Sequence, residues 1–494
     1  MKKFTSIFLV IIFLILGCLE YSSLSYAKSN EGQSSNNSNI YAHYMMGIIY
    51  DRQGEFQKAI EEYKQALEYA TDKVPVYIKI GRNYLKLNKT DEAKSYINKA
   101  IKLSPEDIET HSLLALLYTK ESEYGKAASE YKKVIEISPE NKIALASLAD
   151  IYVLEGKNKQ AIEIYKELIK KEELPVLYFN LGLIYVNTKE TDEAIKCFKK
   201  TIELESRFLA TYLALGLVYE MDKQPEKAIS CYNEALKIDP LNIDFYKQLG
   251  RLYHQEGKLK EAEEQYKFIL ELYPNNTGSY INLTYFYLET EQYKRCIDLL
   301  KRAIQLNVKH KDKLYLLLGS SYQKAKMPDK AEEAYRQAIA LNPESDLAHF
   351  YLGAYYEYHN RRKEAEAQFE KAIEINPDNA DALNYLGYMY AEDGKNLDKA
   401  IEFLNKALEI EPENGAYVDS LGWAYYKKGN IDKALSLIKK ASGLIEDPIV
   451  YDHLGEIYFK MSHKEEARRA WLKSLEIKPG QEKIKNKIER LNLE

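Results

Sequence analysis

The side chains best suited to catalysis or metal binding are few and scattered in this sequence. The eight histidines do not cluster at metal-ligand spacing, because His349 and His359, like His453 and His463, stand ten residues apart. The sequence contains no His-Glu-x-x-His pair, no Cys-x-x-Cys pair, no glycine-rich phosphate loop and no nucleophile elbow. We therefore expect neither an enzyme nor a bound metal or cofactor.

The charge pattern argues against nucleic acid as a partner. Seventy lysines and arginines stand against 75 aspartates and glutamates, which gives a net charge of −5. These charges are spread evenly along the chain, with no basic stripe or tail that could displace counterions from phosphates. We interpret most of them as a solvated outer face.

The dominant pattern is a tyrosine that recurs every 33 to 35 residues, which we call the signature tyrosine. It occupies positions Tyr50, Tyr84, Tyr118, Tyr152, Tyr185, Tyr219, Tyr253, Tyr287, Tyr322, Tyr356, Tyr390, Tyr425 and Tyr458. A period of this length indicates stacked units, none of which can bury its apolar face alone. We expect these tyrosines to lie in the core, because aromatic stripes at helical spacing are usually buried.

Small residues and breakers surround each signature tyrosine at fixed distances. Glycine stands three residues before it in ten units, and alanine stands nine residues after it in almost every unit. Such small side chains let two helices approach closely. Short polar turns such as Glu155-Gly156-Lys157 separate the two helices, and prolines such as Pro105 and Pro377 end the second. Each unit is therefore predicted to be a helical hairpin.

This pattern of small residue, tyrosine, alanine and proline resembles the tetratricopeptide repeat, over residues 40–479. The resemblance implies an all-α fold, a right-handed superhelical solenoid of about thirteen helix-turn-helix repeats. It also implies that the first helices of the repeats line a concave groove. We expect residues 480–494 to form a C-terminal capping helix, because Ile484, Ile488 and Leu491 stand at helical spacing among polar residues.

The first 27 residues are of a different kind. Lys2 and Lys3 precede an apolar run over residues 7–16, which is the layout of a secretory signal and is short for a membrane span of about 20 residues. Three outcomes stay open: cleavage after Ala27, lipidation of Cys18, or an uncleaved anchor. We expect an exported protein, periplasmic or anchored on the periplasmic side, that meets the membrane only through this segment. Residues 28–39 are expected to be a flexible polar linker.

The groove is where we expect binding, at the positions that project from the first helices: nine, six, five and two residues before each signature tyrosine, and one and two residues after it. One aromatic and polar region stands out towards the end of the chain, comprising Phe350, Tyr351, Tyr358, Asn384, Tyr385, Tyr388, Asp419, Trp423, Tyr426, Asp452 and His453. Exposed tryptophan and tyrosine on a rigid wall favour contact with peptide or sugar, because they supply a large area at a low entropic cost.

A second region is basic and could hold an anion: Lys247, Arg251, His254, Asn282 and Lys313. Lys247, Asn282 and Lys313 match three places of the carboxylate clamp found in chaperone-binding members of the resembled family. Arg251 and Leu317 depart from that clamp, so we carry over only the chemistry of a positive pocket that grips a carboxylate or another anion.

Together these features favour a non-enzymatic scaffold of the bacterial cell envelope that binds a protein segment in its groove. A secretion, pilus or exopolysaccharide-export assembly is the expected setting, by analogy of fold alone. The similarity of residues 383–425 to C-terminal repeats of exported bacterial tetratricopeptide proteins favours that setting. Two alternatives stay open: a module that guides an exported polysaccharide along the aromatic groove, which substitution of Trp423 and Tyr426 would test, and an accessory subunit of a separate enzyme.

Overall fold

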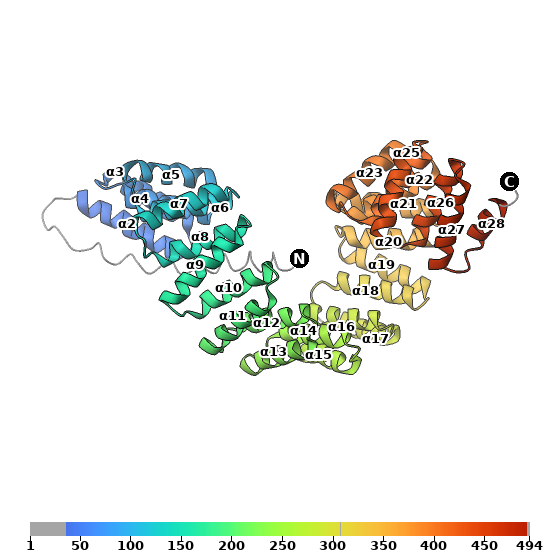
Figure 1. Ribbon diagram of the computed structural model, residues 1–494, viewed down its shortest axis with the longest axis horizontal. Coiled ribbons are helices and arrows are strands. Elements are labelled where there is room, and N and C mark those ends of the chain that lie inside the picture. Colours follow the sequence, from blue (N-terminus) through green and yellow to red (C-terminus); the bar gives the residue numbers. More distant parts are fainter. Residues whose placement is uncertain (1–35, 307, 492–494) are drawn as a thin grey trace. The chain divides into compact units, whose positions relative to one another are not determined.

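The computed structural model describes residues 36–306 and 308–491, and within these ranges it consists of α-helices joined by short turns (Figure 1). The chain divides into two compact units, Met1–Ile238 and Asp239–Glu494, which we call unit 1 and unit 2. The expected signal segment, including Cys18, lies outside the described residues. Helix α2 begins at Asn36, inside the segment that was expected to be linker.

The helices of unit 1 are α2 (Asn36–Arg52), α3 (Phe56–Tyr69), α4 (Val74–Lys86), α5 (Thr90–Leu103), α6 (Ile108–Lys120), α7 (Tyr124–Ile137), α8 (Lys142–Leu154), α9 (Asn158–Lys171), α10 (Pro175–Asn187), α11 (Thr191–Leu204), α12 (Leu209–Met221) and α13 (Pro225–Ile238).

The helices of unit 2 are α14 (Ile243–Gln255), α15 (Leu259–Leu272), α16 (Thr277–Glu289), α17 (Tyr293–Gln305), α18 (Lys311–Lys324), α19 (Pro328–Leu341), α20 (Asp346–Tyr358), α21 (Arg362–Ile375), α22 (Ala380–Asp393), α23 (Leu397–Ile410), α24 (Gly415–Lys427), α25 (Ile431–Leu444), α26 (Pro448–Lys460), α27 (Lys464–Ile477) and α28 (Glu482–Leu491).

The predicted all-α array of helical hairpins is confirmed. Each even-numbered helix from α2 to α26 packs against the next odd-numbered one, which gives thirteen hairpins in the described residues. We call the even-numbered helix of a pair the first helix and the odd-numbered one the second helix. Neighbouring hairpins inside each unit pack against one another in the same chain order.

The small residue before each signature tyrosine is needed for close packing of the two helices. A Cβ atom added to Gly182 on α10 would lie 2.6 Å from the ring of Phe198 on α11, and one added to Gly353 on α20 would lie 2.8 Å from the ring of Phe369 on α21. Real Cβ atoms do not come this close, so each glycine leaves the space that a large side chain of the second helix fills. This is the close approach that the spacing predicted.

The turn between the two helices is built in the same way in every repeat. The residue four positions after the signature tyrosine has a positive φ in all thirteen hairpins, and it is glycine in only five of them. The backbone N–H of the following residue donates to the carbonyl of the signature tyrosine, over 2.7–3.1 Å. This is the left-handed ending that satisfies the last carbonyls of a helix, and it explains the nearly constant period.

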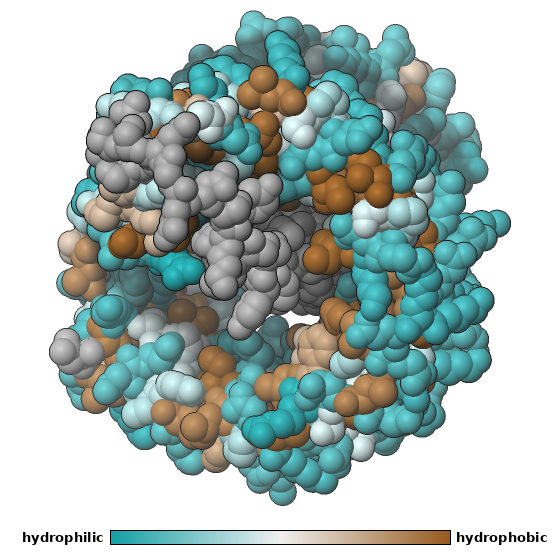
Figure 2. Space-filling view, turned by 90° about the vertical axis from the view of Figure 1, so that its left-hand side faces the viewer, coloured by the Kyte–Doolittle hydropathy of each residue, from teal (hydrophilic) through white to brown (hydrophobic). Residues whose placement is uncertain are grey.

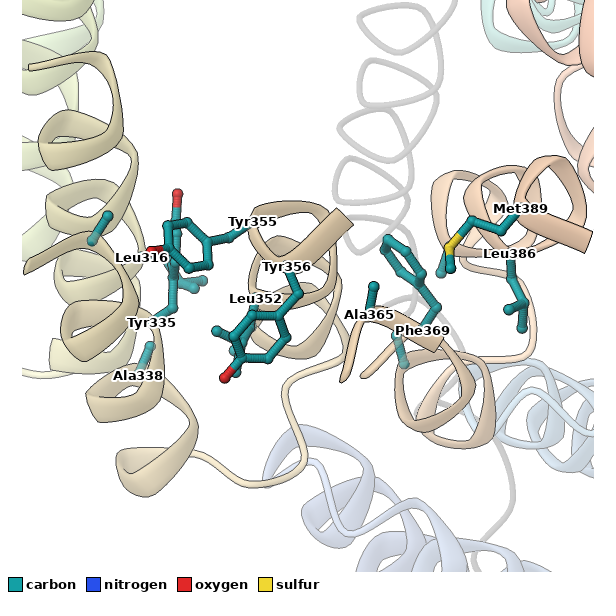
Figure 3. Close-up of a cluster of buried hydrophobic side chains, with 14 of the residues drawn as sticks. Leu316, Tyr335, Ala338, Leu352, Tyr355, Tyr356, Ala365, Phe369, Leu386 and Met389 are labelled. Carbon is teal, nitrogen blue, oxygen red and sulfur yellow. The ribbon is translucent and has the colours of Figure 1, made fainter. Parts of the chain in front are cut away.

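Aromatic side chains fill much of the core. In unit 2, Tyr335, Tyr356 and Phe369 lie in one buried cluster that joins helices α18 to α23, and Figure 3 shows Tyr356 and Leu352 between α19 and α21. The second-helix side chains Tyr63, Tyr165, Tyr232 and Tyr335 are almost completely buried in their own units. The core position expected for the signature tyrosines is confirmed for Tyr84, Tyr152, Tyr185, Tyr219, Tyr287, Tyr356 and Tyr390, which are buried, and the other six are half-buried.

Helix α28 packs on the second helix of the last hairpin. Ile484 of α28 is buried against Ala467 and Trp471 of α27. Hydrophilic side chains cover much of the surface in Figure 2, with hydrophobic residues in scattered groups between them. Within the described residues, no helix combines the length and the apolar character needed to span a bilayer.

Candidate interaction surface on the first helices of unit 2

The first helices of successive repeats contact one another as well as their own second helices. In unit 2 such contacts join α20 to α22, α22 to α24 and α24 to α26. Polar side chains cap the starts of these helices. The Ser345 hydroxyl accepts a hydrogen bond from the backbone N–H of Ala348, and the Asn379 side chain accepts one from the backbone N–H of Ala382. These caps hold side chains of neighbouring first helices on adjacent parts of one surface.

Three of the predicted tyrosines are open to solvent on this surface. The exposed fraction is 40% for Tyr351, 71% for Tyr358 and 36% for Tyr385. The Phe350 ring contacts the edges of Tyr351 and Tyr385, with centroid distances of 5.4 and 5.5 Å. The partly buried Phe350 thus links tyrosines from α20 and α22, and the structure brings these predicted residues together.

The predicted exposure of Trp423 is wrong. Its side chain is only 8% exposed, and its ring lies between those of Tyr426 and His453, with centroid distances of 4.8 and 3.9 Å. The indole N–H donates to the carboxylate of Glu392 on α22. Trp423 therefore joins three neighbouring first helices, and whether it also contacts a ligand stays a prediction.

Asp419 and His453 are also buried rather than presented to solvent. The Asp419 Oδ2 atom lies 3.0 Å from Nδ1 of His453, so a carboxylate on α24 and an imidazole on α26 satisfy each other. Asn384 on α22 is partly buried, and its Oδ1 atom has no hydrogen-bond partner among the described residues.

Carboxylates surround Tyr388 and Tyr385, and three of them, Glu357, Asp381 and Glu392, were not predicted as site residues. Burial raises the pKa of the Tyr388 hydroxyl, and carboxylates from four first helices raise it further: Glu392, Asp419, Glu357 and Asp452. Burial also raises the pKa of Tyr385, with contributions from Glu357 and Asp381. Glu357 and Glu392 stand one and two residues after signature tyrosines, so the positional rule could have found them. The same rule would have found Tyr285 on α16, which is also exposed.

The five residues of the predicted anion pocket lie on three first helices of unit 2. Lys247, Arg251 and His254 are on α14, Asn282 is on α16, and Lys313 is near the start of α18. The Lys247 Nζ atom lies 3.1 Å from Asp244, and Nδ1 of His254 lies 3.2 Å from Glu289. Arg251 donates to Gln248 and Gln255. Lys247 and His254 thus each lie beside a carboxylate, and the anion pocket stays a prediction.

Side chains that could ligate a metal ion are not grouped together in the described residues. In residues 36–306 and 308–491, no three His, Cys, Asp or Glu side chains are grouped so that they could hold an ion. The surface presents exposed tyrosine rings, a side-chain type that is enriched where proteins contact one another.

Comparison with solved structures finds matches at low sequence identity. One match is the crystal structure of the APC/C hetero-tetramer Cut9-Hcn1, at 15% identity and a TM-score of 0.44, covering 93% of this chain and 96% of that one. Another is a thermophilic TPR protein from Thermus thermophilus, at 21% identity and a TM-score of 0.33, covering 37% of this chain and 100% of that one. No curated protein matches the sequence.

Family models give a direct assignment. Six models described as tetratricopeptide repeat match residues 52–117 and 118–174, 173–241, 231–264, 313–345, 355–416, and 449–481. These matches together cover more than half of the chain and fall in both units. They agree with the hairpin geometry and with the glycine contacts described above. The chain therefore belongs to the tetratricopeptide repeat family.

Proposed function

We propose that this protein is a non-enzymatic scaffold that binds an extended segment of a protein partner along the first helices of unit 2. The observation that carries this proposal is the exposure of Tyr351, Tyr358 and Tyr385 above a core that is already filled. Part of the Tyr351 and Tyr385 rings packs on neighbouring rings, and the part that is open to solvent makes such large rigid side chains efficient anchors for a partner.

The repeat fold supports a protein-binding scaffold in general, because stacked hairpins present a long continuous surface. Core contacts such as those of the glycines fix the backbone, so the side chains on the first helices can be specialised for binding without loss of the fold. The polysaccharide alternative uses the same aromatic groove, with Trp423 and Tyr426 as the residues that test it. Burial of the Trp423 ring removes one of the open rings on which that alternative relied.

The test is photo-crosslinking from defined positions of the full chain in its native cells. A photoreactive phenylalanine analogue would replace Tyr358 or Tyr385, and in a matched control it would replace Glu409, which is exposed on the second helix α23. We expect the same protein to be captured from Tyr358 and Tyr385 and not from Glu409. Equal capture from all three positions, or none from the two tyrosine positions, would count against the proposal.

The proposed setting is the bacterial cell envelope, within a secretion, pilus or exopolysaccharide-export assembly. The basis for this part is the sequence of residues 1–27, which has the layout of an export signal. Mass spectrometry of the mature N-terminus gives the test. Cleavage after Ala27 or a lipid on Cys18 would support export, whereas an intact Met1 on protein found only in the cytosol would contradict it.

A further inference from the structure

Charge distinguishes one part of the proposed binding surface from the rest. Five residues of α20 and α22 make up what we call the acidic tyrosine face: Glu357, Asp381, Tyr385, Tyr388 and Glu392. Glu357 acts electrostatically on both tyrosines, Asp381 on Tyr385, and Glu392 on Tyr388. The three carboxylates therefore lie around the two rings, although they come from two helices.

Within the described residues, no lysine, arginine or histidine side chain forms an ion pair with any of these three carboxylates. Asp381 accepts a hydrogen bond of 2.7 Å from the Tyr417 hydroxyl, and Glu392 accepts one from the Trp423 indole, both of which are neutral donors. The Glu357 carboxylate makes no hydrogen bond or ion pair with any other described residue. The Lys427 ammonium nearby donates to the backbone carbonyl of Glu392, over 3.3 Å. The face thus holds negative charge next to exposed aromatic surface.

Helix α26, which is two first helices after α22, shows how carboxylates of a first helix can be paired with a cation within this chain. Asp452 and Glu456 on α26 both bind the ammonium group of Lys487, which comes from the C-terminal helix α28, at 2.6 Å each. The same ammonium lies 5.7 Å from the centroid of the Trp471 ring. A lysine from a separate helix, set against carboxylates and an aromatic ring, is therefore an arrangement that these first helices already accommodate.

We infer that the acidic tyrosine face binds a segment of a protein partner that carries lysine or arginine. The inference rests on the proposed function and names the chemistry of the partner. The rings of Tyr385 and Tyr388 would pack on the aliphatic stems of the basic side chains. The carboxylates of Glu357, Asp381 and Glu392 would form ion pairs with their ammonium or guanidinium groups. Charge complementarity of this kind selects the partner and speeds its association.

The experiment is selection of short random peptides, displayed on phage, by the immobilised full chain. The selected pool is sequenced, and single peptides are then titrated by fluorescence anisotropy. The test variant carries Glu357→Gln, Asp381→Asn and Glu392→Gln, which keep the hydrogen-bond acceptors but remove three charges. The matched control carries Glu374→Gln, Glu402→Gln and Glu409→Gln, which remove three exposed charges from the second helices α21 and α23.

We expect the enriched peptides to be rich in lysine and arginine, to bind the test variant at least about tenfold more weakly than the native chain, and to lose affinity as salt is added. The control variant should bind within about twofold of the native chain. Enrichment of neutral or acidic peptides, or equal losses in both variants, would overturn the inference while leaving the scaffold proposal intact. Failure to enrich any peptide over the bare support would overturn the inference and remove support from the scaffold proposal as well.

Discussion

The indole ring of Trp423 stacks on the imidazole of His453, with centroids 3.9 Å apart and planes inclined by 13°. The contact packs α24 against α26, and the buried Asp419 carboxylate of α24 pairs with the same imidazole. We expect Trp423→Ala to lower the free energy of unfolding by about 2–4 kcal/mol, because it leaves a cavity among buried rings. Urea unfolding followed by circular dichroism measures this.

Tyr358→Ala is the control for that experiment. The Tyr358 ring is 71% exposed and contacts the His359 ring at its edge, so its removal should change the free energy of unfolding by only about 0.5 kcal/mol. Equal losses in the two variants would show that the stack on His453 contributes little. A loss of partner binding in Trp423→Ala would also need this comparison, because unfolding of the last repeats would give the same result.

The Phe198 ring fills the space beside Gly182, so adding a single methyl group at position 182 should be destabilising. A Cβ atom at this position would lie 2.6 Å from the completely buried Phe198 ring, so the ring or the helix would have to shift. We expect Gly182→Ala to destabilise the fold by about 1–3 kcal/mol through overpacking. The thermal midpoint of unfolding measures the effect.

Gly443→Ala is the matched control, because Gly443 is inside helix α25 and nothing lies within 4 Å of an added Cβ atom. Alanine has the higher helix propensity, so this variant should be more stable by about 0.5–1 kcal/mol. Opposite signs for the two substitutions are the expected result. If both raised the midpoint, the glycine before the signature tyrosine would not be required for packing.

The left-handed turn residue gives a prediction in the opposite direction. Lys223 is exposed and has a φ of 55°, a conformation in which an L-residue is strained and glycine is not. We expect Lys223→Gly to stabilise the fold by about 0.5–1 kcal/mol. Gly257→Ala should do the reverse, because Gly257 occupies the equivalent turn with a φ of 71° and open space around it. Loss of stability in Lys223→Gly would contradict the argument.

The hairpins, their small-residue contacts and the final helix could all be predicted from sequence, because each depends on local spacing. Gly182 and Phe198 stand sixteen residues apart, and this separation recurs in nearly every unit. The strain at Lys223 was not predicted, because the sequence pattern marks such turns only where they contain glycine.

The spacing of residues along the helices, which predicted the hairpins, could not predict that Trp423 is buried. Position along a helix fixes the direction of the Cα–Cβ bond, but the ring beyond it can lie flat on a neighbour or stand in solvent. Trp423 lies flat because Tyr426 and His453 offer stacking partners and Glu392 accepts the indole N–H. Those choices depend on three neighbouring first helices, so sequence spacing alone does not determine them.

The buried carboxyl group of Asp150 in unit 1 predicts a pH dependence of stability. Its Oδ1 atom accepts a hydrogen bond of 2.6 Å from the Tyr165 hydroxyl, which in turn accepts one of 3.1 Å from the Asn180 side chain. Burial raises the pKa of Asp150 to about 6, although the hydrogen bond from Tyr165 acts in the opposite direction. In the unfolded chain the pKa is about 3.9.

Between about pH 4 and pH 6 the folded protein therefore binds more protons at Asp150 than the unfolded chain does. The favourable contribution of this group is complete below pH 4 and is lost as the pH rises through 6. Asp150→Asn keeps an acceptor for the Tyr165 hydroxyl but does not titrate. The difference in the free energy of unfolding, variant minus native, should therefore be about 1–2 kcal/mol larger at pH 7 than at pH 4. Urea unfolding of both proteins at the two pH values measures this, and a difference that does not change with pH would contradict the assignment. Because the comparison is between one pair of proteins at two pH values, a general acid sensitivity of the array cancels from it.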